Sequence, residues 1–274
     1  MPELPEVEGV RHYLDRLLTG RTVTAVTVVR PKIIAHPAPE VFVIRLTGQT
    51  FAGVERRAKF LLLRLTDGGT LVLHLRMTGL PLVVPTDAPQ EKHTQVILNL
   101  DNSTELRYLD QRQFGRFWLL EKNEHDDCTG LAKLGPEPLS RAFGPKKLAA
   151  ALGGRKCPIK TCLLDQHTVA GIGNIYADEI LFAARIRPDR PACALSPAEL
   201  SRIAREIKQI LAAAVAKDCL SVSEYDVQHG VEQRDAEKLL VYGRAGEPCV
   251  RCGMPLVRTV IGQRSSYYCP HCQH

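Results

Sequence analysis

The sequence predicts a multi-domain α+β protein that begins with an antiparallel β-sandwich flanked by a helix. A helical domain follows, and the chain ends in a small metal-binding β-hairpin. Short strand-like runs succeed one another between residues 22 and 120 without intervening helices, which favours an antiparallel sandwich or barrel over a doubly wound sheet. Beyond the breaker-rich segment 135–138 the pattern becomes helical, and four cysteines crowd into the last 26 residues.

Composition bounds the class of protein. A chain of 274 residues with 45% apolar and 24% charged residues is long enough to bury its own core. The 36 basic and 30 acidic residues leave a net charge of +6, a mild indication of a polyanionic partner. No apolar run of about 18 residues and no signal-peptide pattern occur, so we expect no membrane span and a cytoplasmic location.

The first helix is placed by its own residues. Pro5 suits the first helical position, and Glu6 and Glu8 put negative charge in the first turn. Gly20 supplies a stop. Between them one apolar stripe runs along the helix, formed by Val7, Val10, Leu14, Leu17 and Leu18.

The strands follow as runs of β-branched and apolar residues separated by turn signals. Asp101-Asn102-Ser103 is such a turn. The predicted strands are Thr22–Val29, Thr50–Thr66, Thr70–Arg76, Val96–Leu100, Glu105–Leu109 and Arg116–Leu120.

The helical part shows clear boundaries. Ser196 as N-cap, Pro197 at the first helical position and Glu199 two residues later form a capping box with a proline start. A polar stretch from Cys219 to Lys238 reads as a long loop. We therefore expect domains at 1–132, 133–240 and 241–274. The predicted helices are Pro145–Leu152, Ile159–Leu164, Ile175–Ala184 and Pro197–Ala216.

The cysteine tail carries the strongest chemical signal. It has the form C-x2-C-x16-C-x2-C, in which each pair brings two thiolates into tetrahedral reach. We expect one structural zinc ion on Cys249, Cys252, Cys269 and Cys272. Four arginines against one glutamate make the tail basic, which suits contact with DNA. A solvated charged face is the alternative.

Three weaker features could carry chemistry. Gly171-Ile172-Gly173-Asn174 precedes a helix and could bind a phosphate, with Asn174 capping the helix, or could be an ordinary helix–helix turn. Removal of Met1 would expose Pro2 as a secondary amine beside Glu3, able to attack an aldehydic carbon, although most N-terminal prolines have no such role. Lys59 lies in a basic cluster that could contact phosphate or simply be solvated.

Taken together, these residues resemble the formamidopyrimidine-DNA glycosylases over nearly the whole chain. The combination of motifs is specific, although no single motif is. The matching segments are Pro2–Glu8, Glu55–Phe60, His74–Met77, Arg112–Gly115, Leu134–Leu139, Gly171–Glu179 and the cysteine tail.

The resemblance implies an N-terminal β-sandwich, a helix–two-turn–helix domain and a zinc finger, with double-stranded DNA held between the lobes. A damaged purine would be flipped out of the stack, because its glycosidic carbon is unreachable inside the duplex. Pro2 would be the nucleophile at C1′, Glu3 the general acid/base, and Glu6 a second carboxylate near the site. β,δ-Elimination would then nick the strand at the lost nucleoside.

The resemblance also implies the DNA contacts. Lys59, Asn174 and Arg264 would hold the phosphates that flank the lesion, and Lys59 would belong with the catalytic group. Met77, Arg112 and Phe114 would fill the vacated stack, with Arg112 pairing to the orphan base, a combination of apolar, planar and aromatic groups suited to that task. The remaining contacts would come from His74, His93 and Arg258.

One segment departs from the family. The base-capping loop, residues 217–238, lacks the usual Gly-Gly after the helix, and Ser223 and Val227 stand where the family has Arg and Asn. Tyr225 and Tyr242 fit the family pattern. The departure bears on lesion preference rather than on the elimination chemistry, which depends on Pro2, Glu3 and the phosphate contacts.

The leading hypothesis is therefore a monomeric DNA glycosylase and abasic-site lyase that acts on oxidised or ring-opened purines such as 8-oxoguanine and formamidopyrimidine. One alternative is a relative that acts mainly as an abasic-site lyase or on oxidised pyrimidines. Another is a non-catalytic binder of damaged DNA with the same fold. A zinc-ribbon nucleic-acid protein without chemistry is the last, and the full-length resemblance disfavours it.

Overall fold

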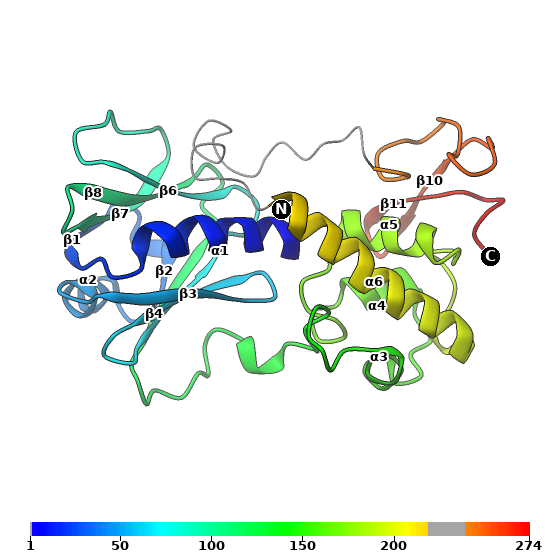
Figure 1. The fold of residues 1–274 in the computed structure, drawn as a ribbon, viewed down its shortest axis with the longest axis horizontal. Coiled ribbons are helices and arrows are strands. Elements are labelled where there is room, and N and C mark those ends of the chain that lie inside the picture. Colours follow the sequence, from blue (N-terminus) through cyan, green and yellow to red (C-terminus); the bar gives the residue numbers. More distant parts are fainter. Residues whose placement is uncertain (1, 219–238) are drawn as a thin grey trace. The chain divides into compact units, whose positions relative to one another are not determined.

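The computed structural model describes residues 2–218 and 239–274. Its residues fall into two compact units, one formed by residues 2–132 with 217–218 and the other by residues 133–216 and 239–274. Each unit is described by itself, with the element labels of Figure 1.

The sandwich unit begins with helix α1 (Leu4–Leu18). Its apolar stripe is buried as predicted, with Leu17 only partly covered. Thr19 ends the helix, and Gly20 follows with φ +82°, the left-handed conformation expected after a helix. The helix starts one residue earlier than predicted, so Pro5 takes the second helical position rather than the first.

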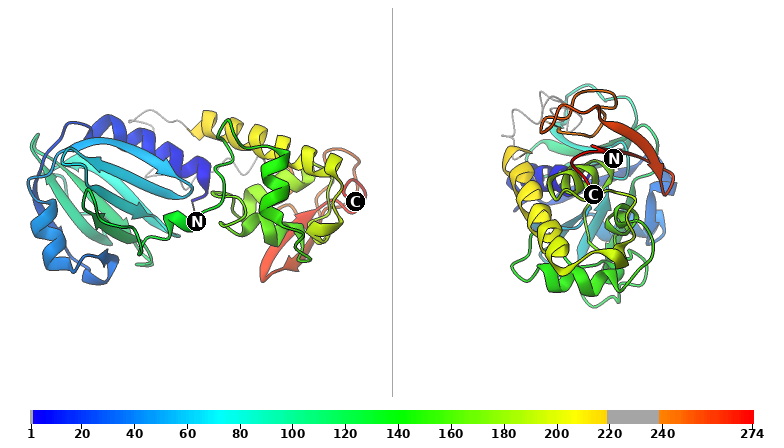
Figure 2. Two further views of the ribbon diagram at one scale, coloured as in Figure 1. Left: turned by 90° about the horizontal axis from the view of Figure 1, so that it is seen from below. Right: turned by 90° about the vertical axis from the view of Figure 1, so that its right-hand side faces the viewer.

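Two sheets form the body of this unit. One has the strand order β1-β7-β8-β6 and the other β2-β9-β5-β4-β3. Figure 1 shows α1 between β3 and β6, and the left view of Figure 2 shows the two sheets face to face. The strands are β1 (Val23–Val28), β2 (Ile34–His36), β3 (Phe51–Arg57), β4 (Phe60–Leu65), β5 (Thr70–His74), β6 (Gly79–Pro85), β7 (Thr94–Leu100), β8 (Thr104–Asp110) and β9 (Arg116–Leu120).

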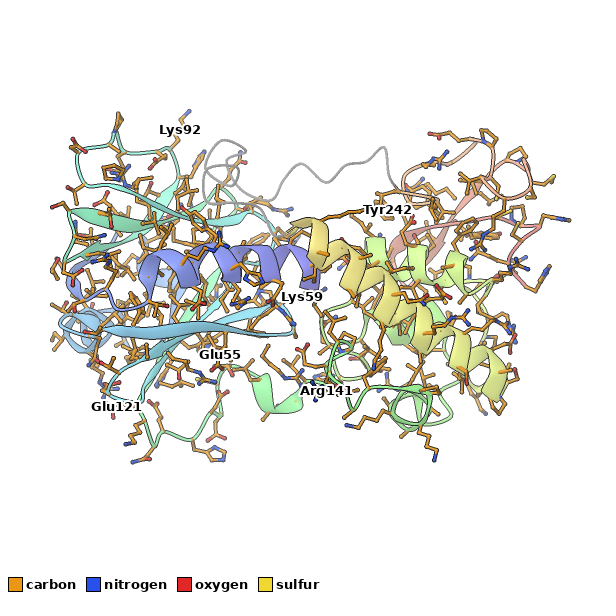
Figure 3. All side chains as sticks on the ribbon, in the orientation of Figure 1. Glu55, Lys59, Lys92, Glu121, Arg141 and Tyr242 are labelled. Atoms are coloured by element: carbon orange, nitrogen blue, oxygen red, sulfur yellow. The ribbon has the colours of Figure 1, made fainter. Side chains whose placement is uncertain are left out.

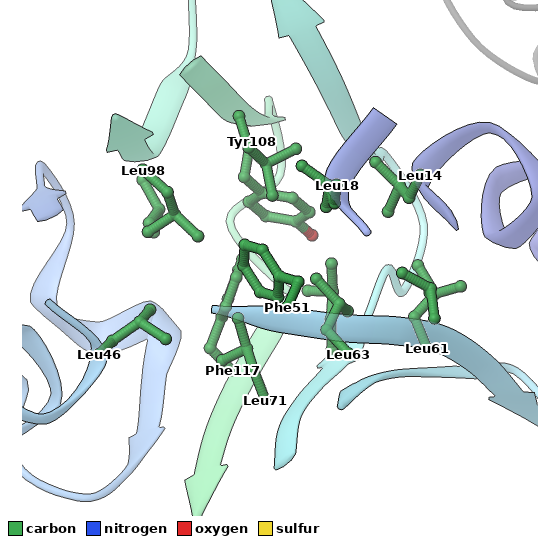
Figure 4. Packing of buried hydrophobic residues seen from close by; sticks show 14 of the residues in the cluster. Leu14, Leu18, Leu46, Phe51, Leu61, Leu63, Leu71, Leu98, Tyr108 and Phe117 are labelled. Carbon is green, nitrogen blue, oxygen red and sulfur yellow. The ribbon is translucent and has the colours of Figure 1, made fainter. Parts of the chain in front are cut away.

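The core lies between the sheets and is closed by α1 (Figure 4). Leu14 and Leu18 come from the helix, Phe51 and Leu63 from one sheet, and Tyr108 from the other. All five side chains are at most 1% exposed. At about 25 cal/mol per Å² of apolar surface, such a core is the main source of this unit's stability.

The predicted antiparallel sandwich is confirmed, with one parallel exception: β2 pairs with β9 in parallel, Ile34 opposite Phe117. The single run predicted at Thr50–Thr66 is wrong, because the chain reverses at Ala58-Lys59 and pairs Arg57 with Phe60. Ala58 adopts φ +54° in this two-residue turn.

The sequence reading missed three elements of this unit: strand β2, helix α2 and strand β6. Helix α2 (Pro39–Leu46) contains a run of β-branched and aromatic residues at 41–44, which is typical of a strand. Strand β6 contains prolines at both 81 and 85. It is nevertheless a strand because it lies at a sheet edge, where proline's missing N–H costs no ladder hydrogen bond. Short 3₁₀ turns lie at Pro31–Ile33 and Leu131–Lys133.

The second unit is helical, as predicted. Ser196 and Glu199 form the predicted reciprocal cap of α6: the Ser196 N–H donates to Glu199 Oε2 at 2.8 Å and the Glu199 N–H donates to Ser196 Oγ at 3.3 Å. A 3₁₀ turn lies at Ala192–Ala194. The helices are α3 (Pro145–Leu152), α4 (Ile159–Leu164), α5 (Asn174–Ala183) and α6 (Pro197–Asp218).

A two-stranded hairpin completes this unit. Strands β10 (Val257–Ile261) and β11 (Arg264–Tyr268) are antiparallel, and α5 contacts β11. The predicted loop at 219–238, including Ser223, Tyr225 and Val227, lies outside the described residues. Within the described part of the chain, no helix combines the length and the apolar content that crossing a membrane requires.

Candidate active site

The N-terminal end of α1 brings Pro2, Glu3 and Glu6 together. Glu3 is the N-cap residue, and its backbone N–H donates to Glu6 Oε2 at 2.6 Å while the Glu6 N–H donates back to the Glu3 carboxylate. Both glutamates are buried, at 2% and 1% exposure, and Pro2 is half-buried beside them. The helix N-terminus favours negative charge at this point. Two carboxylates are therefore held rigidly next to residue 2.

The sequence reading missed this reciprocal cap, although its signal was present. A Glu-x-x-Glu pair that precedes an apolar helical stripe is a capping-box pattern, here with glutamate in place of serine or threonine. The pattern would have placed the N-cap at Glu3 and the helix start at Leu4, as the structure does.

Lys59 lies in the two-residue turn between β3 and β4, and its side chain is only 4% exposed. The neighbouring Arg56 is tied to the α1 helix through Glu8 at 2.6 Å and to the carbonyl of Ala58 at 3.0 Å. Figure 3 labels Lys59 close to the N-terminal end of α1. The basic cluster is thus a fixed part of the fold rather than a solvated face.

His74 ends β5 and stands opposite Phe60, the residue after Lys59. Burial, with the positive charges of Arg76 and Lys59, lowers its pKa to about 3, so the imidazole is neutral at physiological pH. Its Nδ1 accepts the backbone N–H of Arg76 at 3.0 Å, which leaves the proton on Nε2. His74 is therefore a hydrogen-bond donor without charge.

Two loops at the same end of the sandwich carry the residues predicted to fill a vacated base stack. Met77 is 41% exposed in the β5–β6 loop, and Phe114 is 46% exposed in the β8–β9 loop. The Arg112 guanidinium lies over the Phe114 ring, 4.9 Å from its centroid. The exposed His93 joins this end through its carbonyl, which accepts the Asp110 N–H at 3.0 Å.

In the helical unit, Asn174 and Arg258 converge on Ser265. Asn174 Nδ2 donates to the Ser265 carbonyl at 3.1 Å, and Arg258 Nη2 donates to the Ser265 hydroxyl at 2.9 Å. Arg264 is the preceding residue and is exposed. Asn174 does not cap α5 as predicted, because Gly173 is the N-cap and the asparagine side chain turns to the hairpin instead.

Two of the four tail arginines serve the fold. Arg244 pairs with Glu247 at 2.8 Å, and Arg251 donates to the Phe182 carbonyl at 2.8 Å with its guanidinium 4.4 Å from the Phe182 ring centroid. The predicted basic face of the hairpin therefore reduces to Arg258 and Arg264.

The four tail cysteines form a metal site. Their sulfur atoms all lie within 4.8 Å of one another. Backbone N–H groups point at two of them, from Arg251 to Cys249 Sγ at 3.5 Å and from Cys272 to Cys269 Sγ at 3.3 Å, which favours the thiolate form. Four thiolate donors with no open position suit one structural zinc ion, as the sequence predicts.

A buried ion pair that the sequence reading did not find fastens the hairpin to the helices. The side chains of Lys160 in α4 and Asp178 in α5 are both 0% exposed, and Lys160 Nζ lies 2.7 Å from Asp178 Oδ1. Lys160 also donates to the Ser265 carbonyl at 2.8 Å, and Asp178 accepts the Tyr267 N–H at 3.0 Å. The Ser265 carbonyl thus accepts hydrogen bonds from both Lys160 and Asn174.

Glu179 anchors the segment that leads into the zinc finger. Its buried carboxylate accepts the backbone N–H groups of three successive residues, 240–242, at 2.9 Å each. No pattern in the sequence signals either this contact or the ion pair, because the partners lie far apart in the chain.

The fold and these sites define a zinc-finger protein whose β-sandwich gathers buried carboxylates, a lysine and two exposed loops at one end. Family models match three segments: the formamidopyrimidine-DNA glycosylase N-terminal domain over residues 1–117, the formamidopyrimidine-DNA glycosylase H2TH domain over residues 134–226, and the zinc finger found in FPG and IleRS over residues 246–274. The chain belongs to the formamidopyrimidine-DNA glycosylase family.

Individual relatives agree over the full length. The formamidopyrimidine-DNA glycosylase of Geobacillus kaustophilus is 46% identical over 274 residues, with 100% of each chain covered. The Lactococcus lactis enzyme bound to DNA with an AP site is 33% identical, with a TM-score of 0.87 and 99% of each chain covered. The same enzyme with FAPY-dG-containing DNA is 32% identical, with a TM-score of 0.87 over 99% of this chain and 100% of that one.

Proposed function

We propose that this protein is a bifunctional base-excision repair enzyme that removes oxidised or ring-opened purines from double-stranded DNA and nicks the strand at the resulting abasic site. Its family membership supports the proposal, as does its likeness to a bacterial relative solved with AP-site and FAPY-dG DNA. The observation that carries it is the pair of buried carboxylates beside Pro2.

The chemistry begins at Pro2. Removal of Met1 turns its nitrogen into a secondary amine, and an α-amino group with a pKa near ~8 is partly neutral at pH 7. The nitrogen forms a bond to C1′ as the glycosidic bond breaks, and the base leaves with the bonding electrons and takes up a proton from water. Glu3 accepts the proton that the Pro2 nitrogen releases and donates it to the ring oxygen. The bond between C1′ and the ring oxygen then breaks, the sugar opens, and an iminium ion remains between C1′ and Pro2.

The iminium ion then drives strand cleavage. It accepts the electron pair released when a C2′ proton is removed, and the 3′ phosphate leaves. A second elimination expels the 5′ phosphate. Glu3 serves as the proton carrier through these steps, and Glu6 holds the Glu3 backbone in place.

We further propose that Lys59, His74, Asn174 and Arg264 hold the phosphates around the lesion, with additional contacts from His93 and Arg258. Lys59 and the arginines supply charge, whereas the neutral His74 supplies one Nε2–H donor. Met77, Arg112 and Phe114 would replace the stacking and pairing of the extruded base. Their exposure on two loops suits that role.

The proposal extends to the domains, the zinc site and the place of action. The domains would be 1–132, 133–240 and 241–274, with lesion recognition in residues 217–238. One zinc ion would hold the tail on Cys249, Cys252, Cys269 and Cys272, a ligand set that the geometry fits. The protein would act as a monomer on DNA in the bacterial cytoplasm, in association with the nucleoid.

Borohydride trapping tests the proposal. Native protein, with Met1 removal verified by intact mass, should form a covalent adduct with DNA that contains an abasic site. Glu3→Gln should reduce strand cleavage by roughly 10²-fold or more, in the range of a lost general acid/base, while DNA binding persists. Glu40→Gln, an exposed glutamate in the first turn of α2, is the matched control and should trap normally. Absence of any adduct from the native protein would refute the lyase assignment.

A duplex panel sharpens the lesion class. We expect base release from 8-oxoguanine and formamidopyrimidine duplexes, scored separately from strand cleavage at a preformed abasic site. Cleavage at abasic sites without purine release would make the protein chiefly a lyase. Release of oxidised pyrimidines alone would place it with the alternative specificity.

A further inference from the structure

The two exposed loops of the sandwich unit are joined at their base, beneath the residues that we propose to enter the DNA. The β5–β6 loop runs over residues 75–78 and carries Met77, and the β8–β9 loop runs over residues 111–115 and carries Arg112 and Phe114. β6 and β8 are paired neighbours, with Gly79 opposite Asp110. The loops therefore leave the sheet side by side.

The Asp110 carboxylate is the first connection between them. It is 1% exposed and accepts the Thr78 hydroxyl on Oδ1 at 2.5 Å and the Gly115 N–H on Oδ2 at 2.8 Å. The Arg112 N–H is shared between Asp110 Oδ1 at 3.2 Å and the Thr78 hydroxyl at 3.1 Å. One carboxylate thus binds the end of the first loop and both ends of the second.

The backbone of Asp110 is itself fixed from a third element. Its carbonyl accepts the Gln95 side-chain amide at 3.0 Å, and its N–H donates to the His93 carbonyl at 3.0 Å. Because both the backbone and the side chain of Asp110 are hydrogen-bonded, its carboxylate has little freedom to rotate. The two loops are therefore fixed relative to the sheet.

Tyr108 is the second connection. Its ring packs edge-on against Phe117 at 4.9 Å between centroids, deep in the core (Figure 4). Its hydroxyl reaches the space between the two loops, where a methyl group added at Gly79 or at Gly115 would lie 2.0 Å or 1.9 Å from the oxygen. Both residues must be glycine while the tyrosine is present. Burial raises the pKa of this hydroxyl well above 10, so it stays protonated.

We propose that Asp110 and Tyr108 are positioning residues that couple the two loops, so that Met77, Arg112 and Phe114 enter the vacated base stack as one rigid unit. This inference rests on the proposed function. The three side chains come from separate segments and must meet a single gap in the duplex. A misplacement of about 1 Å in such an arrangement can cost on the order of 10²-fold in rate.

Asp110→Asn tests the carboxylate. The asparagine amide has one acceptor oxygen in place of two, so it cannot accept both the Gly115 N–H and the Arg112 N–H, and one loop loses its backbone hydrogen bond to residue 110. We expect single-turnover excision from a lesion duplex to fall by roughly 10- to 100-fold. Trapping on a single-stranded abasic oligonucleotide, which has no stack to fill, should change less than about twofold. Glu105→Gln, another buried carboxylate of β8, controls for a general loss of stability.

Gly115→Ala and Tyr108→Phe test the packing. The alanine methyl group collides with the tyrosine hydroxyl and should reduce duplex excision, whereas Tyr108→Phe keeps the ring on Phe117 and should cause a smaller, few-fold loss. The two changes combined should recover part of the Gly115→Ala defect, because the nearest colliding atom, the hydroxyl oxygen, is gone, although ring carbons of residue 108 at 2.8 and 3.0 Å remain.

A stacking reporter separates positioning from folding. 2-Aminopurine placed opposite an abasic-site analogue should change its fluorescence on binding of the native protein, and this change should shrink in Asp110→Asn at saturating protein. Equal losses on duplex and single-stranded substrates, or an unchanged duplex rate in Asp110→Asn, would overturn the inference. If the native protein traps neither substrate, the proposed function fails instead.

Discussion

In the sandwich unit the exposed loops contact a buried carboxylate, Asp110, and a tyrosine of the hydrophobic core, Tyr108. In the helical unit a buried ion pair and an asparagine hold the backbone of β11, and four cysteines close a metal site beside the hairpin. The first arrangement depends on core packing and on hydrogen bonds to one carboxylate. The second depends on a metal ion and on charges buried far from water, so the two should fail under different conditions.

Zinc removal should separate the two regions most strongly. Four thiolates without their ion no longer hold the hairpin, and small zinc modules commonly unfold without metal. We expect Cys252→Ser, or chelation, to abolish zinc binding and to weaken duplex binding by at least about tenfold, the scale of losing one or two phosphate contacts. The sandwich signals in a ¹H–¹⁵N spectrum should remain. Cys128→Ser, an exposed cysteine of the sandwich unit, is the control.

The buried ion pair should be the next largest effect. Lys160→Met leaves Asp178 uncompensated in a site with 0% exposure, which typically costs about 3–5 kcal/mol. Thermal unfolding should show this loss in the helical unit. The double change Lys160→Met with Asp178→Leu should recover much of the stability, because no lone charge remains. A single variant as stable as the native protein would contradict the structural role assigned to the pair.

The salt dependence of DNA binding should divide the basic residues in two. Lys59→Ala and Arg264→Ala should each reduce the slope of log affinity against log salt by about 1, since each removes a proposed phosphate contact. Arg244→Ala and Arg251→Ala should leave the slope unchanged, because those side chains are used within the fold. Equal slopes in all four variants would contradict the division between arginines and lysines that contact phosphate and arginines that are used within the fold.

The effect that is smallest at neutral pH comes from His74 and grows as the solution is acidified. His74 titrates near 3 in the folded protein and near its ordinary 6.5 when unfolded, because burial disfavours its charged form. As pH falls from 6.5 toward 3, His74 binds a proton in the unfolded state but stays neutral in the folded state. The free energy of unfolding therefore falls by about 1.4 kcal/mol for each pH unit in this range. His74→Gln should lose less stability than the native protein in urea titrations between pH 7 and 4. His125→Gln, on an exposed histidine, should behave like the native protein.

The helix ends and the metal site could be predicted from the sequence because residues close together in the chain form them. The Ser196–Glu199 cap, the stop at Gly20 and the paired cysteines all depend on spacings of a few residues, and the structure reproduces each. The helix at Pro39–Leu46 was not readable, because its β-branched residues favour a strand and only packing against its neighbours decides otherwise.

The sequence by itself determined the order of sandwich, helices and zinc hairpin, because hydrophobic period, capping residues and cysteine spacing act within a few residues. Only the tertiary structure decided how the candidate site is held. Asp110 meets Thr78 across 32 residues, and Lys160 meets Ser265 across 105. Such partners are brought together by strand pairing and helix packing, and a buried polar group must find a partner wherever the fold places one.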